Sequence, residues 1–367
     1  MISKMKCSAL LFMLLPLLAF AGKDGETVEK KIKKDFSIQV NGHLGIDNKY
    51  GSIDLAVGPD NQIKFDITIK VTTGSEKKSQ EVLDHISVNF SEGTNRVDAV
   101  TEIESVSSWM SWFNNGNQEL EINYQVLVPK NVYLQLRNKY GSIYLESTDR
   151  DADIDLSYGD IRLGDINAKL NLDMAYSEGS LSQIKNGDLE LSYSNLEMEN
   201  SQSLDLEMKY SELVMGSSGR LHAVSGYGNL KAGDVDDVSY SGKYDDVHFD
   251  NVKSITVDCG FTGVEIEGIA STGSFDMRYG DLSISNIQAG FKSIDISTSY
   301  TGVELGFQDN ASFTIDAQTN YCDIDHGSDL KVSEYIERTT STSMKASRGT
   351  GGGMVKAVMN YGGLTIE

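Results

Sequence analysis

The sequence is short of the residues that usually build a metal or redox site. Its 367 residues include five histidines, three cysteines and two tryptophans. No two histidines stand at metal-ligand spacing and none falls in a Cys/His cluster, so the spacing predicts no metal site and no cofactor. Proline is also scarce, with three residues, and no long apolar helical stripe occurs. Gly, Ser, Asp, Tyr and β-branched residues are abundant instead, which favours short strands joined by turns.

The sequence also has few positively charged residues relative to its acidic ones. Lys and Arg number 32 against 54 Asp and Glu, which gives a formal net charge of −22. A surface of this sign repels nucleic acid and anionic membrane surfaces, so neither is expected as a partner. The chief basic stretch, EKKIKKD at Glu29–Asp35, is expected to be a solvated N-terminal lead.

The first residues carry the longest apolar run, and they are typical of a secretory signal. Two lysines precede the apolar stretch Ala9–Leu18, and small residues at Ala19 and Ala21 favour cleavage after Ala21. The run is too short for a spanning helix, and Cys7 stands before it rather than at a lipidation point. We therefore expect an exported protein without a transmembrane segment, located in the periplasm or at the cell surface.

One phrase occurs twice in the chain, as NKYGSIDLA at Asn48–Ala56 and as NKYGSIYLE at Asn138–Glu146. From the second copy onward an aromatic residue recurs at steps of 17, 18 or 21 residues, with one last gap of 40. The series is Tyr140, Tyr158, Tyr176, Tyr193, Tyr210, Tyr227, Tyr244, Phe261, Tyr279, Tyr300, Tyr321 and Tyr361. A constant period of this length indicates an internal structural repeat.

The residues around each aromatic predict strands. Apolar residues stand three and five positions after nearly every aromatic, with a mostly polar residue between them, and Gly179 is the exception at the third position. This is the period of a strand with one buried face. A second alternating pair, such as Leu170 and Leu172, follows later in each unit.

A unit this short cannot bury its own apolar face, but stacked units can bury each other's. We therefore predict an all-β fold, a parallel β-solenoid (β-helix) of roughly a dozen 17–21-residue rungs. At about 4.8 Å per rung it would be roughly 55–60 Å long. The alternative is a many-stranded β-sandwich, which does not require so constant a period. Glycine follows several of the aromatics and is expected to mark a corner with unusual backbone angles.

The period is lost near both ends, which suggests boundaries. We expect a signal peptide at 1–21, a lead at 22–34, a β-rich antiparallel N-terminal cap with the first rung at 35–137, and solenoid repeats at 138–332. A flexible loop at 333–353 and a C-terminal edge strand at 354–367 would follow. Strands in the cap are expected at Gln62–Val71, His85–Phe90, Arg96–Glu102 and Glu119–Val128, with a helix at Ser75–Leu83.

An aromatic cluster in the cap is the first candidate binding site. Trp109, Met110, Trp112 and Phe113 stand together among polar residues. Exposed, these rings could grip a sugar or a protein partner. The alternative is that they plug the end of the solenoid core.

Acidic residues recur two positions after the aromatics, as Asp160, Glu178, Glu212 and Asp246. A solenoid would place them along one edge, where they are weak calcium candidates. The plainer interpretation is that they are solvated turn residues.

The two cysteines beyond the signal, Cys259 and Cys322, are expected to be free thiols. They lie at least three rungs apart, roughly 14 Å along the axis at about 4.8 Å per rung. A disulfide requires Cα atoms within about 7 Å.

Three stretches carry a family resemblance, namely FSIQVNGHLGIDNKYGSIDL, INYQVLVPKNVYLQLRNKYGSIYLE and YGDIRLGDI. With the signal, they resemble a bacterial family of exported, adhesin-like β-strand-repeat proteins of unknown function. The resemblance implies an envelope or surface location and no catalytic residues. The expected function is therefore non-enzymatic, an adhesin-like or scaffolding solenoid that binds a protein or glycan of the cell envelope. The alternatives are a polysaccharide-acting enzyme, which requires paired carboxylates in a groove, and an envelope binder of calcium or a small molecule.

Overall fold

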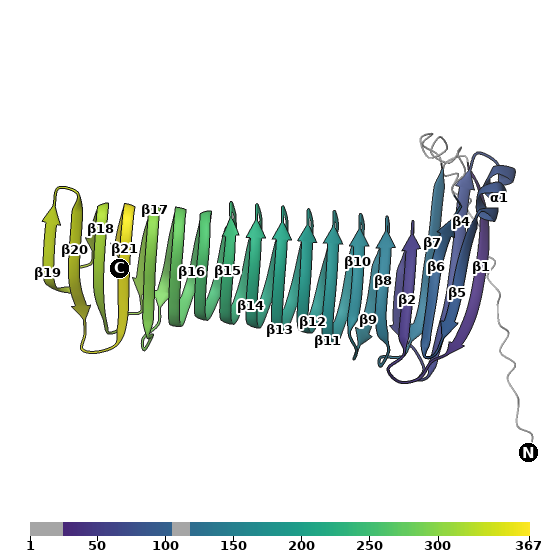
Figure 1. Cartoon of the computed structure of the whole chain (residues 1–367), viewed down its shortest axis with the longest axis horizontal. Coiled ribbons are helices and arrows are strands. Elements are labelled where there is room, and N and C mark those ends of the chain that lie inside the picture. The colour runs from purple at the N-terminus through teal and green to yellow at the C-terminus, as the bar shows by residue number, and fades with distance from the viewer. Residues whose placement is uncertain (1–24, 105–117) are drawn as a thin grey trace, which may run out of the picture.

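Short strands repeat along one axis and build a long rod with a wider cap at its N-terminal end (Figure 1). The computed structural model describes residues 25–104 and 118–367, so the expected signal peptide and the Trp109–Phe113 cluster lie outside the described residues. The strands before the rod's uniform part are β1 (Glu26–Ser37), β2 (His43–Lys49), β3 (Ile53–Val57), β4 (Gln62–Thr73), β5 (Ile86–Gly93), β6 (Arg96–Ile103) and β7 (Glu119–Val128), with one helix, α1 (Glu76–Asp84).

The uniform part begins after the cap. Its strands are β8 (Tyr133–Lys139), β9 (Ile143–Thr148), β10 (Ala152–Ser157), β11 (Asp160–Ala175), β12 (Glu178–Ser192), β13 (Asn195–Lys209), β14 (Glu212–Gly226), β15 (Asn229–Lys243), β16 (Asp246–Ile287) and β17 (Ser293–Phe307). The C-terminal end contains β18 (Phe313–His326), β19 (Lys331–Arg338), β20 (Ser341–Arg348) and β21 (Gly353–Ile366). All of these strands belong to one continuous sheet.

Each rung consists of two extended segments joined by a bend. In β11 the residues before Ile166 pair in parallel with β12, the register shifts between Ile166 and Lys169, and pairing resumes to Ala175. The same parallel pairing repeats between β12 and β13, β13 and β14, and β14 and β15. Alternate side chains such as Leu163 and Leu172 enter one shared apolar core. The predicted parallel β-solenoid is confirmed.

The first rung consists of β2 and β3, and the N-terminal cap adds strands to both of these segments. β7 pairs in parallel with β3 and antiparallel with β4, which pairs antiparallel with β1. On the other segment, β6 pairs in parallel with β2 and antiparallel with β5. The rings of Phe36, Phe65 and Phe90 lie with centroids 5.3–5.8 Å apart at this end, with Phe65 in the core and the other two partly buried against it. The expected antiparallel β-rich cap is confirmed, and its strands and helix form close to the expected bounds.

The basic N-terminal stretch is solvent-exposed as expected, but the expectation that it is a lead ahead of the fold was wrong. Glu29–Asp35 lies inside β1, which pairs with β4 over its whole length. Lys33 forms an ion pair of 2.7 Å with Asp66 of β4. Lysines along an outermost strand discourage a second chain from pairing with its free edge.

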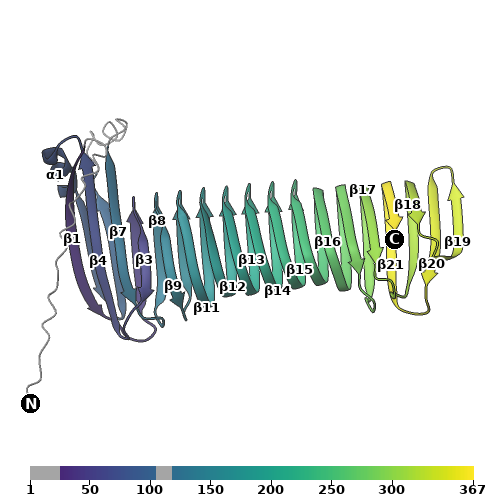
Figure 2. The ribbon, with the colours of Figure 1, turned by 180° about the vertical axis from the view of Figure 1, so that it is seen from behind.

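Two expectations for the C-terminal end were also wrong. Residues expected to be a flexible loop form β19 and β20, an antiparallel pair that continues from β18. The last strand, β21, is not an edge strand. It pairs in parallel with β17 on one side and with β18 on the other, so the chain leaves a gap after β17 and later fills it (Figure 2).

Candidate functional site

The aromatics of the repeat form a continuous column of stacked rings along the rod. Neighbouring centroids lie 4.7–5.3 Å apart, and adjacent rings are tilted by 1–23°. The column starts at Tyr50, continues at Tyr140, and ends in the order Tyr300, Tyr361, Tyr321 because β21 lies between its neighbours. From Tyr140 onward every ring is 43–58% exposed.

The unusual backbone angles fall on the aromatics themselves, with φ between 51° and 63°. The expectation that the following glycines carry them was therefore wrong. Those glycines are needed for another reason, since a Cβ on Gly159 would collide with the carbonyl oxygen of Gly141 in the preceding rung. Where serine replaces glycine, its hydroxyl accepts a backbone N–H instead, as from Ser177 to Ser194 Oγ at 3.1 Å.

The stacking decides what this column can offer to a ligand. Both faces of each interior ring are covered by its neighbours, so the half of the residue that remains exposed is mainly the ring edge. The interior of the column therefore offers ring edges rather than open ring faces, which makes it poorly suited to stacking against a sugar ring.

A groove on one face of the rod is the larger candidate site. It crosses six strands (β3, β9, β11, β12, β13 and β14) and has a volume of about 830 Å³. Its floor is formed by buried residues five positions after each aromatic, such as Leu163 and Met198. Gly164 and Gly216 lie beside the floor where neighbouring backbones approach too closely for a Cβ. Small residues at these points are the reason that the surface is hollowed.

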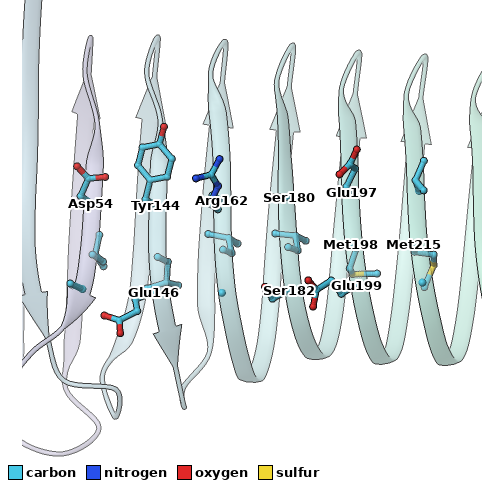
Figure 3. Close-up of a pocket in the computed structure, with 18 residues that line it drawn as sticks. Asp54, Tyr144, Glu146, Arg162, Ser180, Ser182, Glu197, Met198, Glu199 and Met215 are labelled. Carbon is cyan, nitrogen blue, oxygen red and sulfur yellow. The ribbon is translucent and has the colours of Figure 1, made fainter.

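Polar and charged side chains form the wall of the groove. Figure 3 shows Asp54, Tyr144, Arg162, Ser180 and Glu197 in a row on successive strands, pointing out of the same face. The Arg162 guanidinium lies 5.9 Å from the Tyr144 ring centroid, close enough for a cation–π contact. Within the described part of the chain, neither Arg162 nor Glu197 forms an ion pair or a side-chain hydrogen bond, so both charges are available to a ligand.

A second depression of about 690 Å³ adjoins this groove and shares Tyr144, Arg162 and Glu197 with it. It also contains three of the sequence's calcium candidates, Asp160, Glu178 and Glu212. Gly179 also lines it, at a point where a Cβ would collide with Ile161. This explains why the repeat lacks its apolar residue there.

The register places all four acidic candidates in one column, as expected. Asn195 and Asn229 occupy the rungs between Glu178, Glu212 and Asp246. The asparagines separate those carboxylates by two rungs, about 9.6 Å, which weakens their mutual repulsion. Calcium binding by Asp160, Glu178, Glu212 and Asp246 stays a prediction.

The two cysteines and the most buried carboxylate are structural. Cys259 and Cys322 are buried free thiols, and burial raises the pKa of Cys259 to about 12. Asp245 accepts hydrogen bonds from Tyr240 Oη at 2.6 Å, Ser225 Oγ at 2.8 Å and the Gly228 N–H at 2.8 Å. A thiol held protonated and a carboxylate saturated by three donors are poorly suited to catalysis.

Sequence reasoning did not single out Tyr144, Arg162 or Glu197. A signal was present, because each stands four positions after an aromatic, on the outward side of a strand. The groove itself depends on where small residues such as Gly164 and Gly216 fall on neighbouring rungs. This arrangement becomes apparent only once the register of the six rungs is known.

Comparison with known protein families gives a match over most of the chain. The model of the Toastrack DUF4097 family matches residues 59–367. A search for curated relatives found no match. Two similar solved structures cover 92% of this chain each. One, from Clostridium sporogenes, is provisionally named a cell adhesion protein, with 9% identity, 99% of its chain covered and a TM-score of 0.17. The other, from Parabacteroides distasonis, is provisionally named a lipid binding protein, with 11% identity, 96% covered and a TM-score of 0.24.

Proposed function

The chain belongs to the Toastrack DUF4097 family, and from this premise we propose that it is an exported, non-enzymatic envelope protein that binds an extended glycan along the six-strand groove. The observation that supports this proposal most is the shape of the groove. It is open, follows the rod axis across six strands and combines the ring of Tyr144, the guanidinium of Arg162 and carboxylates such as Glu197. Small-molecule sites are more enclosed and bury most of their ligand.

The negative charge of the chain and of its groove indicates which glycans can bind. The chain carries a net charge of −22, and Asp54, Glu146, Glu197 and Glu199 line the groove. A polyanionic polysaccharide would be repelled. Neutral sugars can donate hydroxyl hydrogen bonds to these carboxylates, and amino sugars add an attractive charge.

The binding test compares three soluble oligosaccharides by calorimetry, namely chitin (neutral), chitosan (cationic) and alginate (anionic) oligomers. We expect the first two to bind and alginate not to bind. Replacing both Tyr144 and Arg162 by Ala should weaken binding at least about tenfold, which corresponds to 1.4 kcal/mol. Arg220→Ala is the matched control, because Arg220 is an exposed arginine outside the groove that pairs with Asp205. Equal loss in the control, or strongest binding of alginate, would contradict the proposal.

Two further measurements test the rest of the proposal. If the protein is exported, mass spectrometry of an envelope fraction should find a mature N-terminus at Gly22. Within the described residues no helix is long and apolar enough to span a membrane.

If the protein is a binder rather than a hydrolase or lyase, the same oligomers should show no new reducing ends after prolonged incubation. Sustained product release would favour the enzyme alternative.

A further inference from the structure

Four polar side chains form a square on the outer face of two adjacent rungs of β16. His248 and Asp250 stand on one rung, and Glu265 and Glu267 stand on the next. Within each pair the residues are two apart on a strand and so point to the same face. One ring nitrogen of His248 and one carboxylate oxygen from each glutamate lie within 4.8 Å of one another. In the parts of the chain that the structure describes, this is the one such group of metal-ligating atoms.

The two ring nitrogens of His248 face different carboxylates, which indicates which nitrogen could bind a metal ion. His248 Nε2 lies 3.1 Å from Asp250 Oδ1, whereas Nδ1 lies 3.3 Å from Glu265 Oε2. If the imidazole is neutral and Nε2–H donates to Asp250, then Nδ1 presents its lone pair to a carboxylate oxygen, which is unfavourable unless a metal ion or a second proton lies between them. A carboxylate that holds one imidazole nitrogen while the other faces a metal is the usual arrangement around protein-bound zinc.

The charges nearby favour a cation as well. Three carboxylates meet one imidazole, and Lys231 of β15 is the residue in register with His248 on the other side. A single lysine leaves the square with a negative balance. His248 is about 29% exposed and Glu265 about 59% exposed, and Glu267 is exposed as well. Both glutamate side chains can therefore turn to reach zinc-ligand separations of about 3.4 Å.

We propose that His248, Glu265 and Glu267 bind one divalent transition-metal ion, with zinc as the best fit, and that Asp250 orients the imidazole. The imidazole ligand favours zinc and its first-row neighbours over calcium or magnesium, which prefer all-oxygen sites. Three protein ligands leave the remaining coordination positions open to water or to a group from a partner. The site lies on β16, outside the six-strand groove, so its test is independent of glycan binding.

Calorimetric titration of the full mature protein with ZnCl₂, after treatment with chelator, should give one saturable site per chain. His248→Ala should abolish that site, and Glu265→Gln with Glu267→Gln should do the same. Asp250→Asn should keep the stoichiometry and weaken affinity about 10- to 100-fold. Cobalt(II) added in place of zinc should give a visible absorption band that His248→Ala removes.

Two control variants separate this site from non-specific binding. His222 is an exposed histidine elsewhere on the rod, and Glu304 occupies the same outward position as Glu265 on β17. His222→Ala and Glu304→Gln should leave zinc binding unchanged. The proposal is overturned if His248→Ala binds zinc as the unaltered protein does, or if calcium competes with zinc at equal concentration.

Discussion

Tyrosine at the corner of each rung stands in a backbone conformation that suits glycine. The left-handed region costs an ordinary residue roughly 1–2 kcal/mol, yet 13 aromatics of the column adopt it. Each interior ring stacks on two neighbours, and aromatic pairs contribute about 0.5–1.5 kcal/mol each beyond their buried area. The stacking therefore offsets the strain, which explains an aromatic residue where the backbone alone favours glycine.

Tyr210 tests this balance, because it stacks on Tyr193 and Tyr227 at 4.9 Å. Tyr210→Ala should lower the free energy of unfolding by about 1–3 kcal/mol, since both stacking contacts are lost and the strain remains. Tyr210→Gly should cost less than Ala because glycine tolerates positive φ. Tyr210→Phe should be nearly neutral, as Phe261 already stands in the column. Urea unfolding measures all three, and a Gly variant less stable than the Ala variant would refute the strain account.

Glycine after the aromatic gives a second residue-scale prediction. Gly159→Ala should destabilise by about 3 kcal/mol or more, because the new methyl meets the backbone of the preceding rung rather than a flexible side chain. Gly226→Ala is the matched control on the other side of an aromatic, where no atom lies within 4 Å of the added Cβ. Its stability should stay within about 1 kcal/mol of the unaltered protein. Equal effects of the two variants in thermal melts would contradict the close-approach explanation.

The sequence predicted the period of the aromatic residues, but it did not predict that their own backbone adopts positive φ angles. The glycine that follows several of the tyrosines suggested that glycine supplied the unusual angles, because local propensity alone points that way. The stacking that reverses this preference acts between residues 17 or more positions apart. The same limit hid the square around His248, since its ligands lie 17 and 19 positions apart and follow no known motif.

At the scale of strands, parallel register places like residues side by side, and this has an electrostatic cost. Asp155, Asp173 and Glu190 stand on three consecutive strands in one column. Asp155 is neutralised by Arg137 Nε at 2.8 Å, but Asp173 lies between two carboxylates. Burial, and then the charge of Asp155, raise the pKa of Asp173 above its ordinary value.

Asp173→Asn should therefore stabilise the fold at pH 7, by less than about 1 kcal/mol because the group is largely solvated. The folded pKa exceeds the unfolded one, so the unaltered protein should gain stability as pH falls from 7 toward 4, and the variant should gain less. Asp155→Asn is the control, and it should not stabilise because it loses the Arg137 pair. Urea midpoints across this pH range measure the effect, and a destabilised Asp173→Asn variant at pH 7 would be inconsistent with it.

The C-terminal strand shows where repeat patterns stop being informative. The phrase NYGGLTIE predicted another rung of the same type, and β21 is one. Its place in the stack was not predictable, because a strand with the repeat pattern fits equally well at the end of the rod or inside it. The cap strands were predictable since their longer alternation differs from that of the rungs.

Removal of β21 tests its role as an inserted strand. A chain ending at Gly352 should lose hydrogen-exchange protection in β17, β18 and β20, because β17 and β18 both lose their shared partner. β11 to β14 should stay protected, since repeat units are stabilised mainly by their immediate neighbours. Unchanged protection in β18 would mean that β21 contributes little to the end of the rod.

For the whole molecule, the dominant long-range force is self-repulsion. A net charge of −22 is spread along a rod whose rungs repeat at about 4.8 Å. The Debye length falls from about 30 Å at 0.01 M salt to about 10 Å at 0.1 M, so salt screens repulsion between distant rungs while contacts within a rung persist. We expect the melting temperature to rise by several degrees between 0.01 and 0.3 M NaCl. Sucrose at matched osmolality is the control and should not reproduce the early, steep part of that rise. A melting temperature that falls with salt would show that ion pairs such as Arg137–Asp155 outweigh the repulsion among the remaining carboxylates.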